Sequence, residues 1–172
     1  MSYLVLGCRG VLAGTFLVSL FGKVRGPAAY RAFVRATGRL LSVSGRAGRV
    51  LAALTVAAEC LVVVALVAPA AVGFAAAIGL LCAFSGALVR ALRRGEDAGC
   101  HCFGASTTPV GVHHVVRNLV LVAMAGVGLV VEVWAHPGGY RLAGVAVTAP
   151  AVVACVLLVT RLDDLVALFR IA

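Results

Sequence analysis

The chain has 172 residues, of which 63% are apolar and only 12% are charged, and its mean hydropathy is +1.11. Since soluble domains carry about 25% charged residues, this composition excludes an ordinary soluble enzyme and predicts an integral membrane protein. The net charge of +9 does not indicate nucleic acid binding, because the basic residues lie beside apolar stretches.

Five apolar stretches are each long enough to cross a membrane, which takes about 20 residues in a helix. They cover residues 4–22, 50–68, 70–89, 118–135 and 142–160. The sequence therefore predicts an all-α protein, an integral membrane helical bundle of one compact unit. Arg9 favours a spanning helix over a cleaved signal peptide for the first stretch. Pro69 predicts a tight turn that joins the second and third helices in antiparallel fashion.

The basic residues predict the orientation of the bundle. If the five stretches alternate in direction, 13 of the 15 Lys and Arg residues fall on one side, and only Arg141 and the embedded Arg9 do not. Because such residues are retained on the cytoplasmic side, where they contact anionic lipid, we expect the N-terminus outside. The loop after residue 89 then faces the cytoplasm.

A basic segment separates the first two stretches. Arg31, Arg35 and Arg39 recur every four residues beside apolar residues such as Tyr30 and Phe33. This spacing is typical of a helix that lies in the membrane interface, with its arginines among lipid headgroups. A solvated basic loop is the alternative interpretation.

Cys100 and Cys102 lie in the long polar interruption between the third and fourth apolar stretches. A disulfide that closes over a single residue is strained and therefore exchangeable, which favours thiol–disulfide chemistry. His101 between them can lower the thiol pKa, and Gly99 and Gly104 allow a tight turn. Two ordinary loop cysteines are the plain alternative.

A metal site competes with the redox interpretation. Cys100, Cys102, His113 and His114, with His101 nearby, supply enough sulfur and imidazole ligands for zinc or copper. However, paired cysteines of structural zinc sites are usually two to four residues apart, and adjacent histidines do not easily face one ion.

Glu59 falls near the middle of the second stretch, where a carboxylate needs a partner. Arg9 is the expected partner, with Lys23 or Arg117 as alternatives, and a proton-relay role is a competing hypothesis. Glu132 is expected to reach the membrane interface, where solvation suffices.

The remaining cysteines are expected to have no chemistry. Cys60, Cys82 and Cys155 lie within apolar stretches, where cysteine acts as a small hydrophobe that helps helices to pack. Cys8, near the predicted outer end of the first helix, is a weaker candidate for exchange with an external thiol.

Several motifs together resemble the MauE family of DoxX-like membrane proteins. They are Phe21-Gly22-Lys23, Glu59, Arg94-Gly95, Cys100-His101-Cys102-Phe103-Gly104 and Arg117-Asn118. The resemblance covers about the first 135 residues and implies a DoxX-like four-helix core there, with an additional membrane helix and a cytoplasmic tail in residues 136–172.

The same resemblance implies a function. The family is implicated in maturation of the methylamine dehydrogenase small subunit, a disulfide-rich periplasmic protein, alongside a thioredoxin-like partner. It therefore implies a multi-pass protein of the bacterial cytoplasmic membrane that takes part in thiol–disulfide traffic. The family role lies outside the cytoplasm, whereas loop charge places the cysteine pair inside, so the membrane face of the pair stays open.

We expect Cys100 and Cys102 to exchange electrons with a thioredoxin-like protein, with His101 tuning their acidity. No cofactor is required by the motif, although a quinone is the alternative route for the electrons. A non-catalytic scaffold for a thioredoxin-like enzyme and a metal-handling protein are the competing hypotheses. The client protein is not identified by the sequence.

Overall fold

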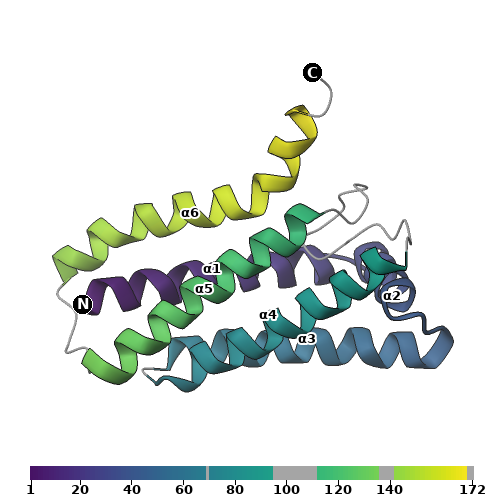
Figure 1. Cartoon of the computed structure of the whole chain (residues 1–172), viewed down its shortest axis with the longest axis horizontal. Helices are drawn as coiled ribbons and strands as arrows, with labels where there is room; N and C mark the ends of the chain where they lie inside the picture. The colour runs from purple at the N-terminus through teal and green to yellow at the C-terminus, as the bar shows by residue number, and fades with distance from the viewer. Residues whose placement is uncertain (69, 95–111, 136–141, 170–172) are drawn as a thin grey trace.

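The computed structural model describes residues 1–68, 70–94, 112–135 and 142–169 of the chain, and in this part of the chain every element is a helix. Figure 1 shows them as long rods that run roughly alongside one another, with one short helix, α2, at one end. The helices are α1 (Ser2–Val24), α2 (Pro27–Leu41), α3 (Gly45–Val67), α4 (Val72–Arg93), α5 (Val112–Ala135) and α6 (Leu142–Phe169).

Five of these helices, all except α2, are long and apolar enough to cross a membrane. Each one contains the corresponding predicted stretch almost completely and extends it by several residues at one or both ends. The expected helical membrane bundle is therefore confirmed. Pro69 lies outside the described residues, between the end of α3 at Val67 and the start of α4 at Val72.

The core of the bundle is formed by α1, α3, α4 and α5. Its fully buried side chains come from all four helices, and examples are Leu12, Leu66, Phe74 and Leu121. Helix α1 is the most buried of the spanning helices, because neighbours cover it on several sides. The first spanning helix is thus the axis around which the other elements pack.

Helix α6 lies along the outside of α1, as Figure 1 shows, and most of its surface is exposed. Two glycines of α1 make this close approach possible. A Cβ atom on Gly10 would lie 2.9 Å from the side chain of Val152, and one on Gly14 would lie 2.7 Å from Val156. Small residues four apart are a common way for membrane helices to approach closely.

The basic segment before α3 is a helix, α2, and the alternative of a solvated loop is therefore wrong. Its Phe33 and Thr37 are buried against the bundle, whereas Arg31, Arg35 and Arg39 are exposed on the opposite face. The carbonyl oxygen of Leu40 accepts a hydrogen bond of 2.6 Å from Arg94, at the end of α4. Helix α2 is thereby held across one end of the bundle.

The cysteines of the described helices differ from the expectation. Cys60, Cys82 and Cys155 are exposed on the outer surface of the bundle, so they do not fill gaps between its helices. Cys8 is buried, because α1 lies at the centre of the bundle, and this burial argues against exchange with an external thiol.

Candidate functional site

The polar side chains of the interior gather at the α2 end of the bundle. Helix α1 ends there, α4 ends there at Arg93, and α5 begins there at Val112 (Figure 1). The predicted redox residues Cys100, His101 and Cys102 belong to the segment that connects α4 to α5, and they lie outside the described residues. The described part of the candidate site consists of the buried polar side chains at this end of the bundle.

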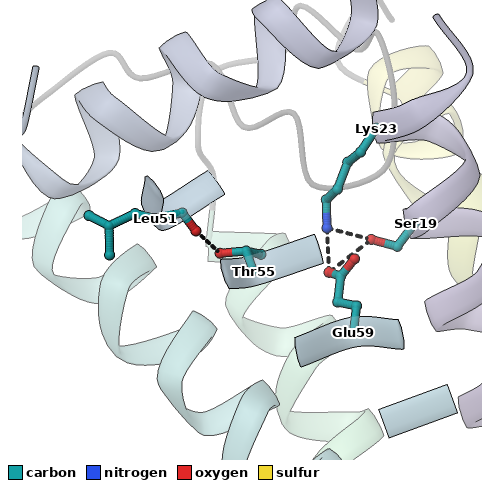
Figure 2. A network of polar contacts seen from close by, with 5 residues as sticks. All are labelled: Ser19, Lys23, Leu51, Thr55 and Glu59. Carbon is teal, nitrogen blue, oxygen red and sulfur yellow. Dashed lines mark hydrogen bonds and ion pairs between the residues drawn. The ribbon is translucent and has the colours of Figure 1, made fainter. Parts of the chain in front are cut away.

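An ion pair between Lys23 of α1 and Glu59 of α3 forms the centre of this region. Both side chains are about 1% exposed, and the Lys23 Nζ atom contacts Glu59 Oε1 directly. Lys23 Nζ also donates to Ser19 Oγ at 2.9 Å, and Ser19 Oγ lies 3.3 Å from the same carboxylate oxygen. Figure 2 shows Lys23 and Ser19 pointing together from α1 toward Glu59.

Aromatic rings complete the surroundings of the Lys23 ammonium group. Its nitrogen lies 5.0 Å from the centre of the Phe33 ring of α2 and 5.7 Å from that of Phe84 of α4. The negative faces of aromatic rings stabilise a desolvated cation within about 6 Å. The pair therefore connects α1 and α3 to both α2 and α4.

A small cavity adjoins Glu59 and Ser19. It has a volume of about 20 Å³, which is room for one water molecule, and its polar lining is Thr15, Ser19, Glu59 and Asn118. Glu59 Oε2 and the Thr15 hydroxyl are buried without a hydrogen-bond partner in the described part of the chain. The cavity thus extends the polar interior from α1 and α3 to α5.

The first turns of α5 add three buried polar residues to this region. His114, Arg117 and Asn118 are at most 5% exposed, and they share one face of the helix through their spacing of three and four residues. They immediately follow the segment that contains the two predicted redox cysteines. A buried guanidinium group at this place contributes positive charge close to the end of that segment.

A second buried ion pair lies toward the opposite ends of α1 and α3. The Arg9 guanidinium contacts Glu132 of α5 at 3.0 Å, and it donates to the carbonyl oxygens of Leu66 at 2.8 Å, of Ala68, and of Ala70 at 3.1 Å. Leu66 and Ala68 are at the end of α3, where carbonyl oxygens have no partner within the helix, and Ala70 lies in the connection to α4. Arg9 therefore binds this helical hairpin to α1.

Comparison with known proteins assigns the chain to a family. The model of the family described as "Methylamine utilisation protein MauE" matches residues 1–131. The chain belongs to the MauE family. It is accordingly a multi-pass membrane protein of a family whose name links it to methylamine utilisation. No match was found among curated proteins or among solved structures.

The family match includes most of the candidate site of this MauE protein. It covers the Lys23–Glu59 pair, the cysteine segment and the polar start of α5, and it ends one residue before Glu132. The division of the chain at residue 135 remains a prediction.

The partners of the two buried carboxylates differ from the main expectation. Glu59 pairs with Lys23, which was an alternative, and not with Arg9. Arg9 instead pairs with Glu132, whose side chain is only 13% exposed and so is not simply solvated at the interface. Arg117 is buried near the cavity, but no ion pair with Glu59 is found among the described residues.

Of the residues proposed for the alternative metal site, only His114 has a side chain that the structure describes. Cys100, Cys102 and the side chain of His113 lie outside the described part, whereas His114 is buried there at the start of α5. Among the described residues, no group of three or more metal-ligating side chains comes together. The metal interpretation therefore gains no support from the described helices.

Sequence reasoning missed several residues of the polar interior. The sequence does indicate the contact between Ser19 and Lys23, because Ser19 precedes Lys23 by one helical turn and so faces the same side of α1. The pairing of Arg9 with Glu132 also has a signal, since both residues lie near the predicted outer face. Thr15 and Phe84 have no comparable signal in an apolar sequence.

Proposed function

We propose that this chain is a membrane thiol–disulfide redox protein in which Cys100 and Cys102 alternate between a dithiol and a disulfide. The observation that carries the proposal is the spacing of these two cysteines by one residue, in the polar segment between α4 and α5 of a MauE-family protein. A pair so close in sequence favours a disulfide that exchanges readily.

The reaction is a transfer of two electrons and two protons between two dithiol–disulfide pairs. In the reducing direction, a thiolate of a thioredoxin-like partner attacks one sulfur of the Cys100–Cys102 disulfide and forms a mixed disulfide. The second partner thiol then displaces Cys100 or Cys102, which leaves the partner oxidised and this chain as a dithiol. The oxidising direction is the same sequence in reverse, and a quinone would be the acceptor in a route without a second thiol protein.

The buried polar end of the bundle supports this proposal through charge and anchoring. Arg94, which is tied to the Leu40 carbonyl of α2, precedes the cysteine segment in the sequence, and Arg117, which is buried in the first turns of α5, follows it. Positive charge favours the thiolate form that attacks disulfides. His101, between the cysteines, is the residue that we expect to tune their acidity.

Differential thiol labelling of the full-length protein in membranes tests the proposal. Membranes are equilibrated at graded ratios of reduced to oxidised dithiothreitol, and free thiols are then alkylated and mapped to individual cysteines. We expect Cys100 and Cys102 to change together in a single two-electron transition. The lipid-facing Cys60 and Cys82 should stay reduced throughout and serve as internal controls, because they lie on separate helices.

Two variants separate the proposal from its competitors. Cys100→Ser should trap a mixed disulfide with a thioredoxin-fold protein through Cys102, whereas the control Cys60→Ser should not change the transition. A scaffold predicts that Cys100→Ser/Cys102→Ser keeps partner assembly while the wild-type pair shows no redox transition. Bound zinc or copper that is lost in this double variant and in His113→Ala would favour metal handling instead.

A further inference from the structure

A groove opens at the turn between α2 and α3, at the same end of the bundle as the Lys23–Glu59 pair. It has a volume of about 460 Å³ and is lined by Val34, Arg35, Gly38 and Arg39 of α2, and by residues 42–45 and Gly48 of the turn and α3. This volume lies within the range of small-molecule sites.

The turn that forms the groove is held in a defined shape. The backbone N–H of Val43 donates to the Gly38 carbonyl oxygen at 2.8 Å, and the backbone N–H of Ser42 donates to the Arg39 carbonyl oxygen at 3.1 Å. A Cβ atom on Gly38 would lie 2.7 Å from the carbonyl oxygen of Val43, so only glycine fits there without displacement of the backbone. The groove is thus part of the fold of the α2–α3 unit.

Arg35 and Arg39 give the groove its chemistry. They are one turn apart on α2, both are exposed, and neither forms an ion pair with a carboxylate in the described part of the chain. Guanidinium groups bind phosphate through paired hydrogen bonds. The start of α3 also lines the groove, at Gly45 and Gly48. The Ser44 side chain forms no cap on that helix, so the first backbone N–H groups of α3 are left without a side-chain acceptor.

The stretch of chain that forms the groove carries only positive charge. No Asp or Glu occurs before Glu59 in the chain, whereas Lys23 and six arginines lie between residues 23 and 49. A site with this charge favours an anion over a neutral or zwitterionic ligand. The distribution of basic residues also places this end of the bundle at the cytoplasmic leaflet, which contains the anionic lipids.

We propose that the α2–α3 groove binds the phosphate headgroup of an anionic phospholipid, with Arg35 and Arg39 as the residues that contact the phosphate. The acyl chains would lie along the apolar surface of the spanning helices. Such a site would fix α2 against the membrane. It concerns lipid recognition and is independent of the chemistry of the two cysteines.

Binding to the full-length protein in a non-ionic detergent tests the proposal. The probes are phosphatidylglycerol, phosphatidylcholine and inorganic phosphate, and the readouts are retained lipid in native mass spectrometry and the shift in thermal unfolding. We expect phosphatidylglycerol to bind in preference to phosphatidylcholine. Arg35→Gln/Arg39→Gln should weaken its binding about 30-fold, since a basic residue contributes about 1 kcal/mol to attraction by anionic lipid.

The matched control is Arg90→Gln/Arg93→Gln, which removes the same charge from exposed arginines of α4 that do not line the groove. It should change binding by less than about threefold, well below one basic residue's contribution. Equal losses in the two double variants would overturn the proposal, because they would show general attraction by charge. Equal binding of inorganic phosphate would also overturn it, in favour of a site for free anions.

A second experiment uses the wild-type protein, so its result does not depend on whether an arginine variant folds. Phosphatidylglycerol with a photoreactive group in its headgroup is crosslinked to the wild-type protein, and the labelled peptides are mapped by mass spectrometry. Labelling concentrated in residues 34–48 would support the groove. Labelling centred on residues 90–94, or spread evenly over the basic segments, would contradict it.

Discussion

The two ion pairs inside the described part of the bundle share helix α1, but different chemical groups hold their cations. Among the described residues, the Arg9 guanidinium contacts three backbone carbonyl oxygens of the α3–α4 hairpin, the Glu132 carboxylate and the face of the Phe74 ring. In the described part of the chain, the Lys23 ammonium group contacts side chains alone, those of Glu59 and Ser19 and two aromatic rings.

This difference assigns distinct roles to the two ends of the bundle. A planar group with five N–H donors suits the several carbonyls that a helix end leaves open, so Arg9 fastens the backbone. A compact ammonium group suits a single carboxylate within a side-chain network. The network at the Lys23 end adjoins a small cavity, whose polar lining reaches Asn118 of α5.

The largest effect is expected from the loss of one partner at the Lys23 end. Lys23→Ala should reduce the free energy of unfolding by about 3–5 kcal/mol, because Glu59 is left as a buried and unpaired carboxylate. Denaturation of the purified protein in mixed detergent micelles measures this change. Lys23→Met/Glu59→Leu, which removes both charges, should recover most of the loss, and a double variant as unstable as Lys23→Ala would contradict the ion-pair explanation.

A smaller effect is expected from a change that keeps the charge at the Arg9 end. Arg9→Lys should cost about 2 kcal/mol, since a lysine retains the pair with Glu132 but loses the fork that reaches several carbonyls. The same unfolding measurement applies, and Arg31→Lys on the exposed face of α2 is the control. An unchanged stability of Arg9→Lys would show that charge alone matters there.

The smallest effects distinguish two hydroxyl groups that both line the cavity. Ser19→Ala should cost about 1–2 kcal/mol, because Lys23 and Glu59 each lose a hydrogen bond to the serine. Thr15→Val should change stability by less than about 1 kcal/mol, as the Thr15 hydroxyl has no partner in the described residues. Equal costs for the two variants would show that the Lys23 network does not depend on Ser19.

Most of the fold was predictable from the sequence, but the pairing of charges was not. Hydropathy located all five spanning helices, and the four-residue spacing of arginines indicated α2, because both signals are local. Glu59 was recognised as a residue that needs a partner, whereas its partner was expected to be Arg9. In the structure, Ser19 lies opposite Glu59, and Arg9 is ten residues away on α1, which is about 15 Å along the helix.

The sequence by itself determined the class of protein, the five spanning helices and the resemblance to the MauE family, and it left the basic segment open between an interfacial helix and a solvated loop. These features follow from composition, from local periodicity and from short motifs. Tertiary structure alone decided that Lys23 neutralises Glu59, that Glu132 pairs with Arg9, and that Thr15 and Asn118 line one cavity. The physical reason is that an intramembrane charge pairs with whatever the register and rotation of neighbouring helices bring beside it, and packing across the bundle sets both.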